Sequence, residues 1–546
     1  MDVAVPFPGD LLVGWFFVER QAMKKRYFSI SSAGVLIFVT MLLLCCAGTP
    51  RPNSGSQAAA ESQSETTILA RSHVSPTRNP LVARYSIELK DGEAAEVEFG
   101  PTTAYGLNTW KQRAPSGGGI VNIWVAGMRP SSLYHMRAIV QRADGTVYKE
   151  QERVFMTGVV PAAWMPTVTV KRTDGEIPSG GIEFLDLIGQ SPKLGAVAYD
   201  LKGNLIWYYD FGANEAKDVP FPMKLLPNGN VLMVVAGPDN GYREIDLAGN
   251  VIRGDTEAGI QERLQEAGFS LVEGGLEHDI LRLPNGHTIL IAYENRIFKD
   301  LPGYPGETNV SGDALIDVDE HGRPVWTWSV FDHLDINRHP FGLPDWTHAN
   351  AVTYSPDDGD LILSLRNQSW VMKIDYEDGQ GSGRILWRLG AGGDFALTNG
   401  ELQDWNYGQH YPTLISPNSM GQFELAMFDN GDNRPMGASG IPCSATANPM
   451  CFSRPVVFQL DEQARTATIN WQNKLPVYSY CCGSVDLLPN GNMEFDIAAT
   501  VGPPQYSTVQ EIAYPGDPQL VWQMIVEGQL AYRATRLPSL YPGVQW

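Results

Sequence analysis

KLLPNGNVLMVV, residues 224–235, consists of an apolar segment, a Pro-Asn-Gly turn and a second apolar segment. An Asn-Gly turn between two such segments predicts a tight β-hairpin. The pattern occurs four more times, as LRLPNGHTILIA (281–292), VTYSPDDGDLILSL (352–365), LISPNSMGQFELAMF (414–428) and DLLPNGNMEFDI (486–497). Its turn prolines are 57, 72, 61 and 72 residues apart. A recurring interval of this size predicts a repeat architecture.

A second hairpin unit lies between the copies of the first. It combines an acidic residue, a glycine turn and usually a closing Trp, as in AYDLKGNLIW (198–207), REIDLAGNVI (243–252), DVDEHGRPVW (317–326) and YEDGQGSGRILW (376–387), with looser copies ending at Trp471 and Trp522. Each period therefore holds four strands, which is typical of a propeller blade. Five copies of the first unit and six of the second predict a six-bladed β-propeller over residues 183–546. RATRLPSLYP (533–542) would supply the missing first unit, whereas a parallel β-helix would need shorter, more uniform coils.

The remaining sequence predicts an all-β chain with a smaller N-terminal module. Residues 80–158 contain short alternating segments such as GIVNIWVAG and LYHMRAIVQ, which indicate a fibronectin-like β-sandwich with a structural or dimerisation role. The 546 residues leave room for both domains. A formal net charge of −21, without a basic stripe, argues against a nucleic-acid partner.

Residues 1–48 have the features of an export segment. An apolar run at 35–44 follows three basic residues at 24–26 and precedes Cys45 and Cys46. The run is too short to cross a bilayer and is typical of a secretory signal. Two outcomes stay open, lipidation of Cys45 or Cys46 as in a bacterial lipoprotein, and simple cleavage near Ala47. We expect an exported, periplasmic protein in which residues 49–79 form a flexible tether.

Four cysteines lie beyond this segment. An even number in an exported chain favours disulfides. Cys443 and Cys451 flank a proline-containing loop, so we expect them to be bonded. Cys481 and Cys482 are adjacent, and pairing them would require a strained eight-membered ring. Their state is left open.

Three of the nine histidines occupy one position in successive repeats. His278, His348 and His410 lie six, eight and seven residues before the turn prolines at 284, 356 and 417. In a propeller this position begins the innermost strand, which lines the central channel. We therefore expect the three imidazoles to meet near one end of the channel.

Asn350 and Arg366 extend this set. Asn350 is two residues after His348 and faces the same way on an extended strand, while Arg366 lies on the returning strand. With no carboxylate obviously interleaved, these donors predict a site for a sulfate-like or phosphate-like anion. Three imidazoles also suit zinc, but Arg366 would oppose a cation. We expect neither a metal nor a cofactor.

Several motifs together resemble the bacterial aryl-sulfate sulfotransferases. They are GLEHDILRLPNG (275–286), DWTHANAVTY (345–354), LILSLRNQSWVMKID (361–375), YGQHYP (407–412), MFDNGDNRP (427–435) and YRATRLPSLYP (532–542). The resemblance covers residues 180–546 and, more weakly, the N-terminal sandwich. It implies a six-bladed propeller, a homodimer and a transfer between aryl sulfates and phenols that needs no adenylated donor.

The resemblance also implies roles for individual residues. His410 matches the family's nucleophile, which becomes a sulfohistidine, and His278 matches the histidine that exchanges a proton with the phenol. His348, Asn350 and Arg366 match residues that hold the sulfate oxygens. The family commonly carries a disulfide near the site, which Cys443 and Cys451 would supply. The sequence departs from the family at Asn367, where close relatives have His, and at the Cys481–Cys482 pair.

The chemistry agrees with these roles. Charge spreads over three peripheral oxygens in a loose transition state, so donors arranged in advance stabilise it. A neutral imidazole is a competent nucleophile. Aromatic residues near the site, at positions 346, 405, 407 and 411, are candidates to stack on the substrate. A quinoprotein dehydrogenase is the rival enzyme, because of its Asp…Gly…Trp blade motifs and vicinal cysteines, and a non-catalytic binding propeller is the other alternative.

Overall fold

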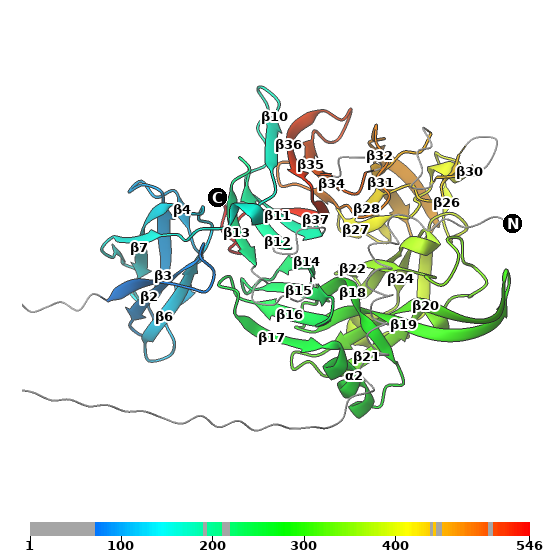
Figure 1. Ribbon diagram of the computed structural model, residues 1–546, viewed down its shortest axis with the longest axis horizontal. Helices are drawn as coiled ribbons and strands as arrows, with labels where there is room; N and C mark the ends of the chain where they lie inside the picture. The colour runs from blue at the N-terminus through cyan, green and yellow to red at the C-terminus, as the bar shows by residue number, and fades with distance from the viewer. Residues whose placement is uncertain (1–70, 189–193, 210–218, 437–440, 444–449, 501–505) are drawn as a thin grey trace, which may run out of the picture. The chain divides into compact units, whose positions relative to one another are not determined.

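Antiparallel sheets make up nearly all the regular structure in the computed structural model of this protein (Figure 1). The structure describes residues 71–188, 194–209, 219–436, 441–443, 450–500 and 506–546. The predicted export segment (1–48) and the tether up to residue 70 lie outside the described residues. Within the described part of the chain, no helix is both long and apolar enough to cross a membrane.

The N-terminal strands form two sheets with a shared core. One sheet has the order β1 (Ser72–Pro76), β2 (Ala83–Leu89), β6 (Gly119–Val125). The other contains β3 (Ala94–Gly100) and β7 (Leu133–Gln141), flanked by β4 (Leu107–Asn108), β5 (Gln112–Arg113), β8 (Val147–Lys149) and β9 (Arg153–Met156). Alternate residues of β2, β3, β6 and β7 are buried against one another, as period-two patterning predicts. Strand β1 replaces the last part of the predicted tether because its backbone pairs with β2.

Six larger sheets follow in the chain, between residues 168 and 537. Their strands, in spatial order, are β13 (Leu205–Tyr209), β12 (Ala196–Asp200), β11 (Ile182–Ile188), β37 (Leu530–Leu537); β14 (Val219–Leu225), β15 (Val231–Ala236), β16 (Gly241–Ile245), β17 (Val251–Thr256); β18 (Glu273–Arg282), β19 (Thr288–Leu301), β20 (Tyr304–Val318), β21 (Pro324–Ser329); β22 (Ala349–Ser355), β23 (Asp360–Leu365), β24 (Trp370–Ile374), β25 (Ile385–Leu389); β27 (His410–Leu414), β28 (Gln422–Asp429), β31 (Arg454–Asp461), β32 (Thr466–Gln472), β26 (Ala396–Leu397); and β33 (Val485–Leu487), β34 (Met493–Ile497), β35 (Tyr506–Ile512), β36 (Leu520–Glu527), β10 (Val168–Arg172).

From the second sheet onward, neighbouring sheets contact each other through the strand named first in each. β14 contacts β18, β18 contacts β22, β22 contacts β27, and β27 contacts β33. β37 pairs with β11 and contacts both β14 and β34, so the C-terminal strand completes the sheet formed by residues 182–209. Residues 533–537 of the predicted closing segment 533–542 lie in this strand. β10 adds an edge strand to β36, so the large sheets begin at residue 168 and not at 183.

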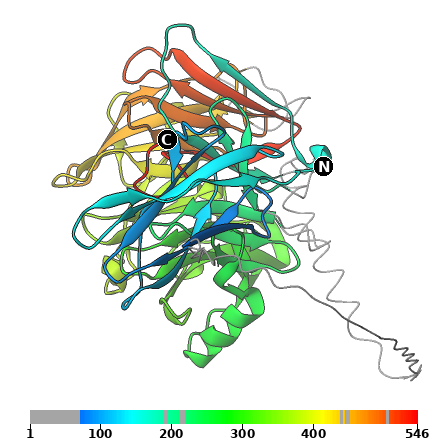
Figure 2. The same ribbon diagram turned by 90° about the vertical axis from the view of Figure 1, so that its left-hand side faces the viewer.

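The repeated Pro-Asn-Gly turns explain why the hairpins recur. Gly229, Gly286 and Gly491 have φ of 78°, 89° and 86°, a conformation that residues other than glycine seldom adopt. Apart from strands, the described chain carries one α-helix, α2 (Glu257–Glu266), which follows β17 and buries Ile260 and Leu264 (Figure 2). The Thr256 hydroxyl caps it by accepting a hydrogen bond from the Gly259 nitrogen.

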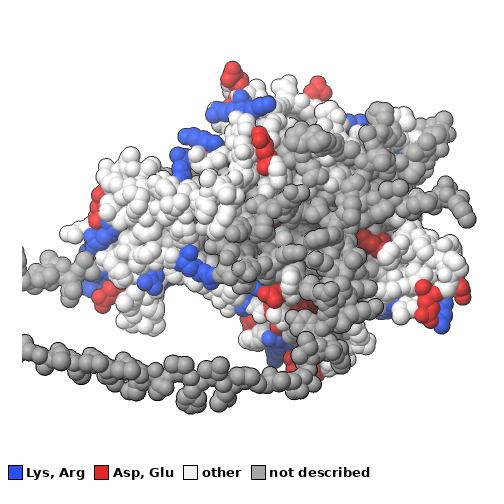
Figure 3. Space-filling model, viewed as in Figure 1, with Lys and Arg blue, Asp and Glu red and all other residues white. Residues whose placement is uncertain are grey.

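Charge on the molecular surface agrees with the composition. On the face drawn in Figure 3, Lys and Arg side chains are scattered among Asp and Glu and do not form a continuous basic stripe. Two surface hollows, of about 90 and 220 Å³, lie beside Tyr242 and are lined by none of the predicted site residues.

Candidate active site

The structure brings the three predicted histidines together. His278 lies in β18, His348 directly precedes β22, and His410 begins β27. All three are buried, and the rings of His278 and His348 are 4.5 Å apart between centroids. Tyr532 of β37 joins them, since its ring centroid is 6.0 Å from that of His278 and 6.3 Å from that of His410. The common position in the repeats thus corresponds to a common location.

The strands bend where the histidines lie. Strand pairing is interrupted between Leu276 and Ile280 in β18, between Ala349 and Ala351 in β22, and after His410 in β27. His278 and His348 have φ of 47° and 52°, in the left-handed region that non-glycine residues seldom adopt. Such bulges and strained residues redirect side chains and concentrate at functional sites. They turn the imidazoles toward one another, away from a regular alternation.

His410 has one defined tautomer. Its Nδ1 is 2.7 Å from Asn430 Oδ1, and Asn430 is oriented because its Nδ2 donates to the carbonyl oxygens of Ser479 and Cys482, at 3.0 and 3.1 Å. An amide oxygen only accepts, so Nδ1 carries the proton and Nε2 carries the lone pair. The backbone nitrogen of Cys482 donates to Nε2 at 3.2 Å. Burial, reinforced by the charge of Arg366, holds the pKa of His410 well below its usual range.

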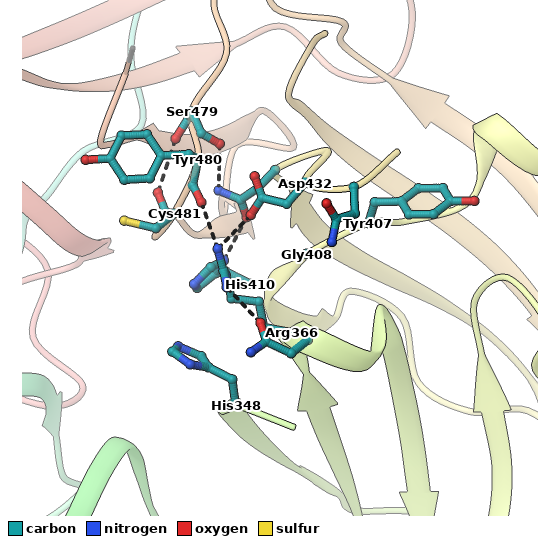
Figure 4. Close-up of polar contacts among 12 residues, drawn as sticks. His348, Arg366, Tyr407, Gly408, His410, Asp432, Ser479, Tyr480 and Cys481 are labelled. Atoms are coloured by element: carbon teal, nitrogen blue, oxygen red, sulfur yellow. Dashed lines mark hydrogen bonds and ion pairs between the residues drawn. The ribbon is translucent and has the colours of Figure 1, made fainter. Parts of the chain in front are cut away.

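Arg366 lies beside His410 and is held from several sides (Figure 4). Its guanidinium donates to Asp432 Oδ2 at 2.9 Å, to Asn367 Oδ1 at 2.8 Å and to the carbonyl oxygen of Tyr480 at 3.3 Å. Burial raises the pKa of Asp432 to about 6, against the opposing charge of Arg366 and a hydrogen bond from Tyr478. The arginine is therefore fixed in place before any anion binds.

Carboxyl groups also accompany the other two histidines. His348 Nδ1 is 2.7 Å from Asp345 Oδ2, and His278 Nδ1 is 2.6 Å from Glu277 Oε2. Burial lowers the pKa of His278 to about 4. Burial by itself would raise the pKa of Asp345, but the charge and hydrogen bond of His348 outweigh it and leave that pKa below its usual value. The expectation that no carboxylate interleaves with the donors is wrong, because Glu277 is adjacent to His278 in β18 and Asp345 lies three residues before His348 in the segment before β22.

Asn350 braces the site. It is fully buried, and its amide nitrogen donates to the carbonyl oxygen of Gln409 at 2.8 Å, next to His410. Its backbone carbonyl oxygen accepts from Arg533 at 2.7 Å and from Tyr532 at 3.2 Å. Asn350 therefore ties β22 to β27 and β37. Its predicted contact with an anion stays a prediction.

The prediction that aromatic residues at positions 346, 405, 407 and 411 stack on the substrate is mostly wrong. Trp346 and Trp405 pack inside hydrophobic clusters, and the buried Tyr407 donates its hydroxyl hydrogen to Leu402. Tyr411 instead stacks against the guanidinium of Arg533, 4.4 Å from its ring centroid. Trp346, Trp405 and Tyr407 lie in the segments that precede β22 and β27 and fill the space between sheets, so sequence position alone does not separate them from ligand contacts.

The cysteines separate into two kinds. Cys443 and Cys451 form the predicted disulfide. Cys481 and Cys482 are free thiols whose sulfur atoms lie 2.7 Å apart, and the backbone nitrogen of Cys482 contacts His410. Cys443, Cys482, Tyr478 and Tyr480 share one hydrophobic cluster, so the disulfide supports the segment that contacts His410.

Sequence reasoning missed Asn430, Asp432, Glu277, Asp345 and Tyr532. Each lies inside a quoted motif, and a signal was present in MFDNGDNRP, where two polar residues follow a buried strand. In the described ranges, no three His, Cys, Asp or Glu side chains are grouped so that they could hold a metal ion.

Comparisons place the chain among known proteins. No curated protein sequence matches it significantly. Among solved structures, a protein of unknown function from Bacteroides caccae is 12% identical, with 64% of this chain and 91% of that chain covered and a TM-score of 0.30. Cobalt-substituted Synechocystis ACO is 11% identical, with 84% and 96% covered and a TM-score of 0.31. A profile of the arylsulfotransferases matches residues 169–533, which include every predicted site residue. The chain belongs to the arylsulfotransferase (ASST) family.

Proposed function

We propose that this sulfotransferase moves a sulfuryl group from an aryl sulfate to a phenol in two steps, through a sulfohistidine at His410. The observation that carries the proposal is the arrangement at His410, where Asn430 fixes a lone pair on Nε2 and Arg366 lies beside the ring. A neutral, oriented imidazole is ready to act as a nucleophile. Its lowered pKa keeps it unprotonated at neutral pH.

In the first step, Nε2 of His410 attacks the sulfur atom and the bond from sulfur to the aryl oxygen breaks. The phenolate leaves with the bonding electrons and takes a proton from His278. Arg366 and one N–H of Asn350 face the peripheral oxygens, where charge accumulates. His348 joins them as an imidazolium, which donates to Asp345 through Nδ1 and to a sulfuryl oxygen through Nε2. The Cys482 N–H loses its acceptor when the Nε2 lone pair is used and becomes a further donor to the sulfuryl group. In the second step an acceptor phenol reverses this sequence.

The leaving group explains a preference for aryl donors. A phenol has a pKa of about 10, like the tyrosine side chain, so its anion departs with modest assistance from an acid. An aliphatic alkoxide is far more basic and would leave much more slowly. The transfer then requires neither a metal nor an adenylated sulfate.

We further propose an architecture and a location for the protein. The six large sheets would be the blades of one six-bladed propeller, and residues 80–158 a fibronectin-like sandwich. Residues 1–48 would direct export to the periplasm, with either lipidation or cleavage, and the protein would form homodimers. Serial contacts of the first strands and closure through β37 support the propeller.

A trapped intermediate tests the function. Purified protein incubated with an aryl sulfate and no acceptor should release about one phenol per active site and then slow down. Mass spectrometry should find an acid-labile sulfuryl adduct on the peptide containing His410, and a phenol should discharge it. H410A should show neither burst nor adduct, whereas H321A, which alters an exposed histidine, should retain both. Transfer without burst or adduct would overturn the nucleophile, and binding without transfer would leave a non-catalytic propeller.

A further inference from the structure

Two buried carboxyl groups lie behind His278. Glu277 is its neighbour in β18, and Asp313 lies on β20, two strands away in the same sheet. Glu277 Oε2 is 2.6 Å from His278 Nδ1. The Glu277 and Asp313 side chains are hydrogen-bonded to each other, and Tyr293 of β19 also bonds Glu277. Three successive strands therefore supply polar groups to the rear of one imidazole.

The contact between the two acids requires a proton. As carboxylates, Glu277 Oε1 and Asp313 Oδ1 would both be buried acceptors without a donor. The other oxygen of Asp313 already accepts from the Ala349 nitrogen at 2.9 Å and from the Thr347 hydroxyl. A proton on Asp313 Oδ1 satisfies both orphaned oxygens, and a proton on Glu277 Oε2 makes the bond to His278 Nδ1. In this arrangement all three groups are neutral.

We propose that Glu277 stores the proton that moves to His278 Nδ1 when His278 gives its Nε2 proton to the departing phenolate, which makes Glu277 a positioning residue for His278. The inference rests on the proposed function. Because Glu277 donates to Nδ1, the hydrogen of His278 lies on Nε2, the ring nitrogen left to meet the substrate.

Proton transfer then balances over one cycle. The phenolate takes the Nε2 proton, and the Glu277 proton moves to Nδ1. Glu277 becomes a carboxylate that accepts from His278 Nδ1–H and from the protonated Asp313. In the second step the acceptor phenol returns a proton to Nε2, and the Nδ1 proton returns to Glu277. No proton is gained from solvent or lost to it.

The surroundings favour neutral groups over an ion pair. Burial raises the pKa of Glu277 to about 8, with a further contribution from the charge of Asp345, and lowers the pKa of His278 to about 4. Burial and the neighbouring Glu277 raise the pKa of Asp313. The other charged groups facing His278 are Asp345, Arg366 and Arg533, which reach it from the loop before β22, from the turn after β23 and from β37.

E277Q separates proton storage from positioning. The glutamine amide donates to His278 Nδ1 as the protonated acid does, so the imidazole keeps its orientation and its Nε2 hydrogen. It has no proton to release. Burst rates with 4-nitrophenyl sulfate, whose anion needs no acid, should stay within about threefold of wild type. Burst rates with phenyl sulfate should fall about 100-fold, the usual contribution of general acid catalysis. E294Q, which alters a buried acid on β19 that bonds Arg296 and Ser329, should change neither rate.

The pH dependence gives a second, independent measurement in the wild-type protein. The phenyl sulfate burst should decline as pH rises through about 8, where Glu277 loses its proton, while the 4-nitrophenyl sulfate burst should not. Equal loss with both donors in E277Q, or the same pH profile for both donors in wild type, would overturn the proton store. Absence of any burst in wild type would instead overturn the proposed function, so the two failures are distinguishable.

Discussion

The backbone nitrogen of Cys482 lies 3.2 Å from Nε2 of His410 and donates to it. The same imidazole is fixed from the other side by Asn430, whose amide also bonds the Cys482 carbonyl oxygen. Asn430 thus positions both the predicted nucleophile and the N–H group that faces it. Hydrogen bonds of amide groups hold this arrangement, since neither contact with the His410 ring involves a charged group.

Replacing Asn430 should therefore slow the transfer strongly. In N430L the side chain keeps its bulk but loses the acceptor for Nδ1, so His410 is no longer held in one tautomer. Removing the group that orients a metal-ligating histidine typically costs 10–100-fold, and we expect a loss of about this size in the burst rate with little change in KM. N418A, in a turn beside Glu462, serves as the control. An unchanged burst rate in folded N430L would contradict the assignment.

Arg366 should not be replaceable by lysine. Its planar guanidinium bonds three different groups, and an ammonium group cannot reproduce that geometry. We expect R366K to lower kcat about 100-fold, as for the loss of one transition-state donor. The matched control is R388K, which alters an arginine of β25 that pairs with Asp394. Equal activities of R366K and wild type would show that the guanidinium does not face the sulfuryl group.

The Cys443–Cys451 disulfide should stabilise the fold. It closes a loop with a sequence separation of 8, for which loop-closure entropy gives about 2–3 kcal/mol. The double variant C443S/C451S should lose about this much unfolding free energy in urea. Reductant should destabilise wild type by a similar amount and leave the double variant unchanged. A reductant effect that persists in the double variant would assign the stabilisation to other thiols.

Stability should fall as pH rises from about 4.5 to 8. Burial raises the pKa of Asp186 and Glu277 to about 8, that of Asp486 to about 7 and that of Asp432 to about 6. These acids keep their protons in the folded state after the unfolded chain has released them, so rising pH favours unfolding. His278, His333 and His410, whose pKa values burial lowers, act in the opposite direction below pH 6.5, but the raised carboxyl groups are more numerous.

Urea unfolding between pH 5 and 8 measures this dependence. The free energy of unfolding should decrease across the range. The decrease should be less steep in E277Q because one titrating group is gone. A free energy that rises steadily with pH would show that these carboxyl groups ionise normally in the folded protein.

Much of the fold was predictable from local sequence. The Pro-Asn-Gly turns, the alternation within strands and the spacing of the repeats set the hairpins and placed His278, His348 and His410 at equivalent positions. Closure by residues 533–542 followed from the missing repeat. These features were accessible because turn geometry and strand periodicity depend on neighbours in the chain.

The chemistry within the site depended on tertiary structure. Asn430 reaches His410 across a hairpin, Asp432 reaches Arg366 from another sheet, and Asp313 meets Glu277 two strands away. Sequence spacing does not predict which buried acids contact each other. Burial beside such partners decides which group is protonated. The sequence alone therefore determined the repeating hairpins and the set of donors, whereas only the packing of separate strands determined their tautomers, partners and charges, because desolvation and hydrogen bonding act through space.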